Sequence, residues 1–238
     1  MRTRTSPLPG GSALPPRASL EPHLDGRVES SAERESLFQS LPISILAVCF
    51  SYLDLRSLVR VRQTCSRFRE AVNASLPLRT DFNFSGLKAT DEQVLHMVMC
   101  ARHCVELDLW CSKVTRSCFY QLAQAEMCRQ LVKLSLWGVS SASDETLGQL
   151  LPHCSQLRCL NLGGTFVGDT TVQRLPQWCP MLRTLVLHNC RCLVQITESL
   201  SVAVKHLPYL NELFIWGADV GLHTHAALLE LNPSLRIR

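Results

Sequence analysis

A short apolar pattern recurs five times between Cys104 and Ile215: an apolar residue, two others, Leu, any residue, then Leu or Ile. The middle leucines of successive copies lie 27, 26, 25 and 28 residues apart, and they are Leu107, Leu134, Leu160, Leu185 and Leu213. Apolar residues two apart lie on one face of a short strand, and the rest of each period can return the chain on a helix. One such unit cannot bury its apolar face alone, so stacked units that share a core are predicted.

The predicted fold class is α/β: a parallel sheet with outer helices over residues 81–238, with a period in the leucine-rich-repeat range. A weaker copy begins at Phe82, and a last copy begins at Leu235, so about six repeats are expected. The final strand is only begun where the sequence stops, and we interpret the solenoid as truncated at its C-terminus. An uncapped edge of this kind is expected to fray in isolation and to be covered by a partner, by the target or by self-association.

Two segments precede the repeats. Residues 1–35 are rich in Pro, Gly, Ser and Arg and are expected to form a disordered tail. Residues 36–80 have helical periodicity, and Asp54 is expected to cap the second of three short helices. Three short helices have a thin core, so this segment is expected to rest on the repeats that follow.

Composition and charge argue against several functional classes. No run of 18 apolar residues exists and the N-terminus lacks an apolar signal region, so we expect neither a membrane span nor secretion. The net charge of +4 arises within residues 36–80, where no aromatic or glycine-rich nucleic-acid motif accompanies it. We interpret this charge as a solvated helix face and expect no nucleic-acid partner.

The twelve cysteines do not indicate a disulfide framework, because several of them recur at fixed places in the repeats. Small buried thiols fit a helix-to-strand corner, so reduced cysteines in a cytoplasmic or nuclear protein are expected. Two groups of histidine and cysteine residues resemble zinc ligands in type, but the sequence has no C-x-x-C pair, and no metal or other cofactor is predicted. These groups are His96, Cys100, His103 and Cys104, and the Cys190-x-Cys192 pair.

An acidic residue opens most of the predicted helices, and we expect it to accept hydrogen bonds from the free N–H groups of that helix. The positions are Thr90-Asp91, Ser143-Asp144, Gly168-Asp169 and Thr197-Glu198.

The stretch from Leu41 to Leu58, and onward through Arg60, Cys65, Arg67 and Phe68, resembles an F-box. The matching positions are Leu41-Pro42, Ile45-Leu46, Ser51-Tyr52-Leu53, Leu55 and Leu58; the departures are Cys49, Thr64, Phe68 and the lack of an acidic pair after the proline. The repeats resemble the cysteine-containing leucine-rich repeats that often follow an F-box. The order of the two motifs is more specific than either motif alone.

This resemblance implies a substrate receptor of an SCF-type cullin-RING ubiquitin ligase. The F-box would bind the adaptor subunit that tethers receptors to the cullin, and the repeats would hold a target protein for ubiquitination. The chain itself would not be an enzyme, and no catalytic residue is expected. The implied adaptor-binding residues are Leu41, Pro42, Ile45, Leu46, Phe50, Leu53 and Leu58.

The sheet face away from the core is the predicted target-binding surface. Three columns of residues are expected to point outward there, and three tryptophans share one column, in which Trp110 and Trp137 are close enough to stack. Exposed aromatic residues anchor protein interfaces, but they could instead cover the sheet and stabilise neighbouring strands. The predicted target-binding residues are Glu106, Asp108, Trp110, Lys133, Trp137, His188, Phe214 and Trp216. Glu106 and Asp108 favour a basic, partly apolar target segment.

A second interpretation is a leucine-rich-repeat scaffold unconnected to ubiquitin, in which residues 36–80 are only a hydrophobic cap. The Leu41-Pro42 opening discriminates between the two, because adaptor docking needs it and a cap does not.

Overall fold

The computed structural model describes residues 40–217 and 221–238, so the predicted tail at residues 1–35 lies outside the described residues. Residues 41–238 form one compact unit. It begins with three helices, α2 (Ile43–Ser51), α3 (Leu55–Arg62) and α4 (Ser66–Ser75), and a short 3-10 turn, η1 (Leu76–Leu78). Asp54 caps α3 as predicted, because its Oδ1 accepts a 2.8 Å hydrogen bond from the Ser57 N–H.

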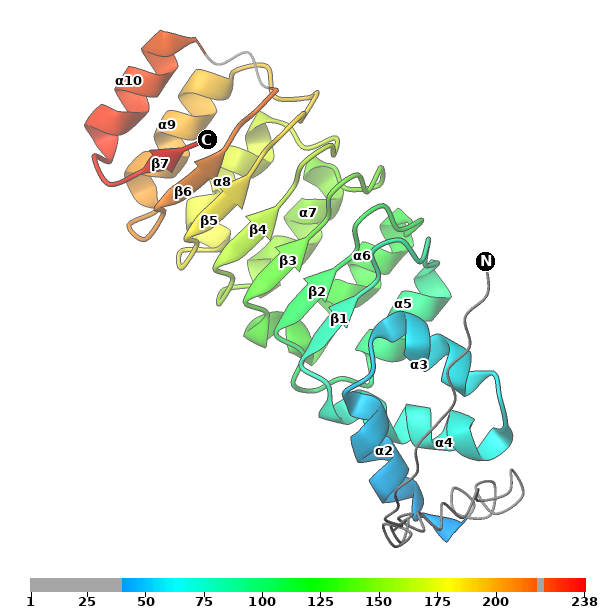
Figure 1. Ribbon diagram of the computed structural model, residues 1–238. Coiled ribbons are helices and arrows are strands. Elements are labelled where there is room, and N and C mark those ends of the chain that lie inside the picture. The colour runs from blue at the N-terminus through cyan, green and yellow to red at the C-terminus, as the bar shows by residue number, and fades with distance from the viewer. Residues whose placement is uncertain (1–39, 218–220) are drawn as a thin grey trace, which may run out of the picture. The chain divides into compact units, whose positions relative to one another are not determined.

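Short strands then alternate with helices to the end of the chain (Figure 1). The strands are β1 (Asp81–Asn83), β2 (Glu106–Asp108), β3 (Lys133–Ser135), β4 (Cys159–Asn161), β5 (Thr184–Val186), β6 (Glu212–Phe214) and β7 (Arg236–Ile237). The helices are α5 (Asp91–Val98), α6 (Arg116–Ala123), α7 (Asp144–Leu150), α8 (Asp169–Trp178), α9 (Ile196–His206) and α10 (Leu222–Leu231), with 3-10 turns η2 (Glu126–Gln130) and η3 (Leu151–His153). No helix among the described residues has the length and apolar character needed to span a bilayer.

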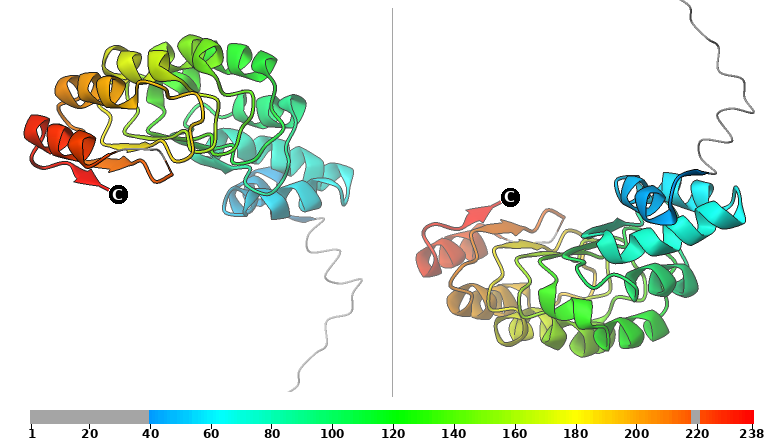
Figure 2. Two further views of the ribbon diagram at one scale, coloured as in Figure 1. Left: turned by 90° about the horizontal axis from the view of Figure 1, so that it is seen from above. Right: turned by 90° about the horizontal axis from the view of Figure 1, so that it is seen from below.

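The seven strands form one parallel sheet in chain order. The helices α5–α10 lie on one side of it, and the opposite face is open (Figure 2). Each pairing has the register that the repeat predicts, since Leu107 lies opposite Leu134 and Leu134 lies opposite Leu160. The last strand, β7, pairs with β6, and the Ile215 N–H donates to the Arg238 carbonyl at 2.9 Å.

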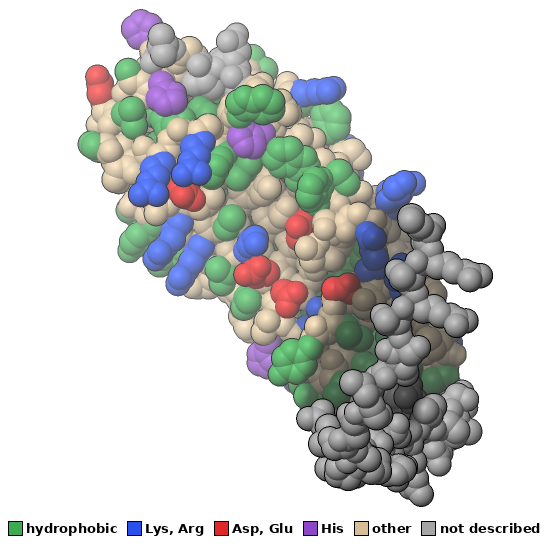
Figure 3. All heavy atoms as spheres, viewed as in Figure 1, with side chains coloured by type: hydrophobic (Ala, Val, Ile, Leu, Met, Phe, Trp, Pro, Cys, Tyr) green, Lys and Arg blue, Asp and Glu red, His purple; other side chains and the backbone are tan. Residues whose placement is uncertain are grey.

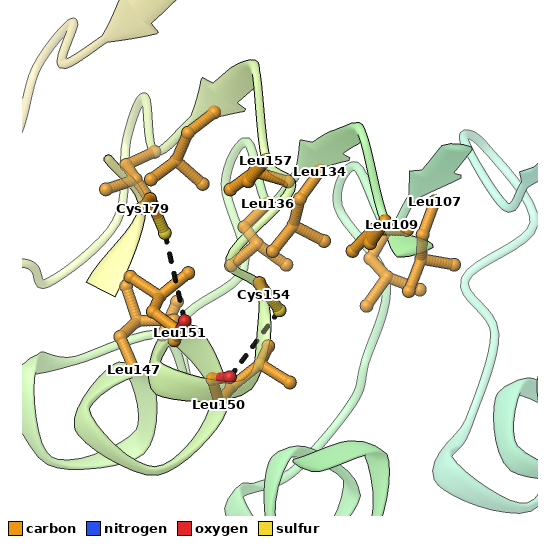
Figure 4. Close-up of a cluster of buried hydrophobic side chains, with 14 of the residues drawn as sticks. Leu107, Leu109, Leu134, Leu136, Leu147, Leu150, Leu151, Cys154, Leu157 and Cys179 are labelled. Atoms are coloured by element: carbon orange, nitrogen blue, oxygen red, sulfur yellow. Dashed lines mark hydrogen bonds between the residues drawn. The ribbon is translucent and has the colours of Figure 1, made fainter. Parts of the chain in front are cut away.

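The repeated leucines fill the space between sheet and helices (Figure 4). Leu134, Leu136 and Leu160 have no exposed surface. Buried cysteines close the corners between helix and strand, where the Cys154 thiol donates to the Leu150 carbonyl at 3.5 Å. Burial raises the pKa of Cys179 to about 12, so this thiol stays protonated at neutral pH and packs as a small apolar side chain.

The helical segment shares this core with the repeats. Leu58 and Leu76 are buried in one cluster with Phe82 and Phe84 of the first repeat. The buried Arg79 side chain joins the two parts, because it donates to the carbonyls of Ser51 and Leu53 in the helical segment and to the Asp81 carbonyl in β1. The three short helices therefore rest on the repeats, which supply the apolar surface that they lack.

The acidic residues at the helix starts have a role other than the predicted one. Thr90 and Ser143 form capping boxes for their own helices. The carboxylates of Asp91, Asp144 and Asp169 instead accept hydrogen bonds from the following repeat. The donors are the Thr115 N–H and hydroxyl for Asp91, the Gly168 N–H and Thr171 hydroxyl for Asp144, and the Val194 and Gln195 N–H groups and the Ser199 hydroxyl for Asp169. Each carboxylate thus joins two neighbouring repeats.

Replacing Asp169 with alanine is expected to lower the free energy of unfolding at pH 7 by about 1–3 kcal/mol, because N–H donors of the next repeat lose a charged acceptor. Partial burial acts to raise the pKa of Asp169, but the hydrogen bonds from Gln195, Ser199 and Val194 outweigh it and hold the pKa below its ordinary value. A depressed carboxylate pKa stabilises the fold above the unfolded-state pKa of about 3.9, and this contribution disappears as the pH falls through the lower folded-state value.

Urea titrations of the parent and Asp169→Ala at pH 7 and at lower pH values measure this contribution. The difference between the two proteins is expected to shrink below about pH 4. Glu198→Ala, which removes an exposed carboxylate, is the matched control and should change stability by less than about 0.5 kcal/mol. A difference that stays constant down to the acid-unfolded region would contradict the assignment.

Candidate protein-binding surface

The open face of the sheet carries the three predicted columns of outward-pointing residues, in register. The first column includes Glu106 opposite Lys133, and the second includes Asp108 opposite Ser135. Glu106 and Lys133 form an ion pair at 3.4 Å. In Figure 3, which looks onto this face, acidic side chains gather over the first strands, and a hydrophobic area with a histidine in it lies beyond them.

After each of the first six strands, a residue in the left-handed region follows the third-column residue directly. These six residues are Gly86, Cys111, Gly138, Gly164, Asn189 and Gly217. Glycine adopts this conformation without strain, which explains why four of the six are glycine. The shared turn gives the third-column residues the same backbone setting from repeat to repeat.

Four aromatic side chains of the third column, which also holds Ser85 and Gly163, form a row of contacting rings with Phe214 of the second column. We call Trp110, Trp137, His188, Phe214 and Trp216 the aromatic row. Trp110 and Trp137 meet edge to face, with ring centroids 6.4 Å apart and planes at 64°. The two rings are in contact as predicted, but they meet edge to face instead of stacking, which is another arrangement that aromatic quadrupoles favour. His188 continues the row, with its ring 5.7 Å from Trp137, 5.9 Å from Phe214 and 6.4 Å from Trp216.

Gly163 makes this row possible, and the sequence prediction did not recognise its role. A Cβ atom at this position would lie 2.5 Å from Trp137 Cε3, so the Trp137 ring lies over the glycine. The ring thereby spans the β4 position and reaches His188, two strands away. The sequence contained one indication of this role, because Gly163 is the one glycine among the third-column residues and so leaves space beside Trp137.

The row differs in exposure along its length. Trp216 is 74% exposed and Trp110 is 48% exposed, whereas Trp137, His188 and Phe214 are partly buried by their neighbours. Arg238 was also missed by the prediction; its guanidinium lies over the Phe214 ring, 5.7 Å from the centroid. All eight predicted target-binding residues thus lie on one face, and none of them is buried.

The predicted adaptor-binding residues are not all on the surface. Leu46 and Leu58 are at most 2% exposed and belong to the interior, so they are removed from the proposed docking surface. Phe50 and Leu53 are partly buried and pack against the core. Leu41 is also partly buried, and Pro42 and Ile45 are exposed.

The exposed face of α2 includes residues that the prediction missed. Val48 is 47% exposed and Tyr52, directly after the helix, is 86% exposed. Together with Ile45 and Cys49 they follow the spacing i, i+3, i+4, i+7, which places them on one side of a helix. We call Ile45, Val48, Cys49 and Tyr52 the α2 surface stripe. The prediction had combined residues of this stripe with residues of the buried side.

The histidines and cysteines considered for zinc do not assemble. Among residues 40–217 and 221–238, no group of three or more His, Cys, Asp or Glu side chains has an arrangement that could hold a metal ion. His96 is directed toward Arg62, with 3.4 Å between its Nε2 and the Arg62 Nη2. All twelve cysteines are free, and seven of them are buried or partly buried.

Comparison with known proteins supports both parts of this architecture. Residues 38–82 match the F-box-like family. An internalin (inlF) from Listeria monocytogenes has a similar fold, with a TM-score of 0.50 and 16% sequence identity over 76% of this chain. This chain spans about half of the internalin, 53% of its length.

Two further solved structures share weaker similarity. The tropomodulin C-terminal domain of Caenorhabditis elegans has a TM-score of 0.40 and 17% identity, covering 51% of this chain and 77% of that one. The leiomodin-1 actin-binding site 2 has a TM-score of 0.44 and 15% identity, covering 75% of this chain and 87% of that one. The chain consists of an F-box-like segment followed by a leucine-rich-repeat-like α/β solenoid, an architecture typical of adaptor and protein-interaction proteins.

Proposed function

We propose that this chain is the substrate-recognition subunit of an SCF-type cullin-RING ubiquitin ligase. The observation that carries the proposal is the combination of an F-box-like segment with an exposed apolar stripe on α2 and a repeat sheet with an exposed aromatic row. The α2 surface stripe, with Pro42, would bind the adaptor subunit. The aromatic row and its acidic neighbours would bind the target.

The chain would act by proximity. The segment at residues 38–82 and the repeats share one core, so a target on the sheet would be held at a fixed distance from the adaptor and the cullin. Such positioning raises the effective concentration of target lysines near the ubiquitin-charged enzyme. The chain would supply no nucleophile, and we place its action in the cytoplasm or the nucleus.

A second function is a repeat scaffold outside the ubiquitin system. It is favoured by the burial of Leu55, Leu58 and Leu76 in a core continuous with Phe82 and Phe84, which is what a hydrophobic cap would do. A cap accounts for these buried residues, whereas it gives no role to the exposed stripe on α2.

Affinity purification of the full chain followed by mass spectrometry separates the two functions. The ligase receptor should co-purify with an adaptor subunit and a cullin, and the reconstituted complex should ubiquitinate the co-purified target. Recovery of repeat-bound proteins without adaptor and cullin would support the scaffold and overturn the ligase proposal.

A further inference from the structure

The aromatic row borders a groove of about 360 Å³ on the open face of the sheet. Trp110 and Trp137 line it together with Asp108 and Ser135, which end strands β2 and β3. The remaining lining residues are Lys133, Leu134, Cys159, Asn161 and Val186. The groove thus combines two indole rings with a carboxylate, and most of its remaining lining is small or uncharged.

Asp108 has a structural role that does not need its charge. Its Oδ1 accepts a 2.9 Å hydrogen bond from the Trp110 N–H, two residues further on. Asn83 and Asn161 occupy the same column and make the same bond with their amide oxygens, to Ser85 and Gly163. An amide therefore suffices for this turn, and the negative charge at position 108 is available for another purpose.

The surroundings leave that charge without a cation of its own. Lys133 lines the same groove, but its ammonium group is paired with Glu106 at 3.4 Å. Within the described part of the chain, no hydrogen bond or ion pair reaches Asp108 Oδ2. Asp81, Glu106 and Asp108 line an adjoining hollow. Arg79 lies 3.8 Å from the Asp81 carboxylate and Lys133 pairs with Glu106, so among the described residues Asp108 is the acid of this hollow that has no basic partner.

We infer that this groove binds a basic side chain of the target, an arginine or a lysine, which packs against the indole rings and pairs with the Asp108 carboxylate. The inference rests on the proposed target-binding role of the sheet and specifies the ligand. A cation over an indole face gains electrostatic attraction from the ring, and the apolar stem of a long basic side chain packs against the aromatic wall. The carboxylate supplies the counter-charge.

The direct test titrates the 238-residue chain with Nα-acetyl-arginine N-methylamide and its lysine counterpart. The indole N–H signals of Trp110 and Trp137, assigned by replacing each with Phe, should shift in a saturable way with at least one of the two probes. The norleucine counterpart has a similar stem without charge and should bind at least about fivefold more weakly. The two basic probes together show which cation the groove prefers.

Asp108→Asn is the decisive variant, because it keeps the turn hydrogen bond and removes only the charge. It should weaken the binding of the basic probe about fivefold without changing the thermal midpoint. Glu198→Gln, which removes an exposed carboxylate on α9, should leave the affinity unchanged. The inference is overturned if neither basic probe shifts the indole signals, if norleucine binds equally well, or if Asp108→Asn binds like the parent.

Failure of this inference is distinguishable from failure of the proposed function. Co-purification of adaptor and cullin does not involve the groove, so it tests the ligase assignment separately. A ligase receptor whose target binding is unaffected by Asp108→Asn would keep its function and lose this recognition mode. A chain that binds the basic probe but never recovers the adaptor subunit would keep this recognition mode and lose the ligase function.

Discussion

Replacing Ile45, Val48 and Tyr52 together with alanine is expected to lower the affinity for the adaptor subunit by about 100-fold. These side chains are 49%, 47% and 86% exposed, so they contribute little to the interior but offer apolar surface to a partner. Loss of about 3 kcal/mol of apolar contact corresponds to two orders of magnitude in affinity. Alanine has high helix propensity, so α2 should remain folded.

The measurement is co-purification with adaptor and cullin, followed by titration with purified adaptor. Phe166→Ala with Val194→Ala is the matched control, because it removes similarly exposed apolar surface from the repeats. The control should bind adaptor like the parent. Adaptor binding by the triple variant at parental strength would show that the α2 surface stripe is not the docking surface.

Replacing Trp110 and Trp137 together with alanine is expected to reduce target binding by about 100-fold or more, because aromatic anchors carry a large share of interface energy. Stability should fall by only about 1–2 kcal/mol, since Trp110 is 48% exposed and Trp137 is partly buried over Gly163. Adaptor binding should be unchanged, because the α2 surface stripe is intact. The target is the protein recovered with the parent chain by affinity purification.

Gly163→Ala provides a subtler version of the same test. The added methyl group would occupy the place of the Trp137 ring, so the ring must move while both tryptophans are retained. Target binding should weaken by about tenfold, which corresponds to 1.4 kcal/mol. Tyr209→Ala removes an exposed aromatic residue outside the row and should have no effect on target binding.

Large destabilisation by the double tryptophan variant, with target binding retained, would mean that the row only stabilises the sheet.

The strand register was predictable from the sequence because of the spacing of the leucines. Residues two apart in a strand point the same way, and one face of each strand must be buried, so slipping the register by one residue would expose the leucines. The pairing of Leu134 with Leu107 and Leu160 follows from this requirement. The columns on the open face follow from it as well.

The buried and exposed sides of α2 were not predictable in the same way. Ile45 and Leu46 are adjacent apolar residues, yet the first is 49% exposed and the second 2%. Apolar residues occupy both sides of this helix, so periodicity does not select the side that packs on α4 and η1. The packing of the neighbouring elements decides it.

The remaining features depend on contacts between residues one or two repeats apart. The sequence determined that acidic residues start the helices, but only the stacking of repeats brings the Asp169 carboxylate to the Val194 and Gln195 N–H groups. In the same way, the repeat placed the tryptophans in one column, whereas the space over Gly163 decided that Trp137 leans across it toward His188. Local propensity and period fix the backbone of each repeat, and side-chain direction between repeats is set by the volume that the neighbouring repeat leaves free.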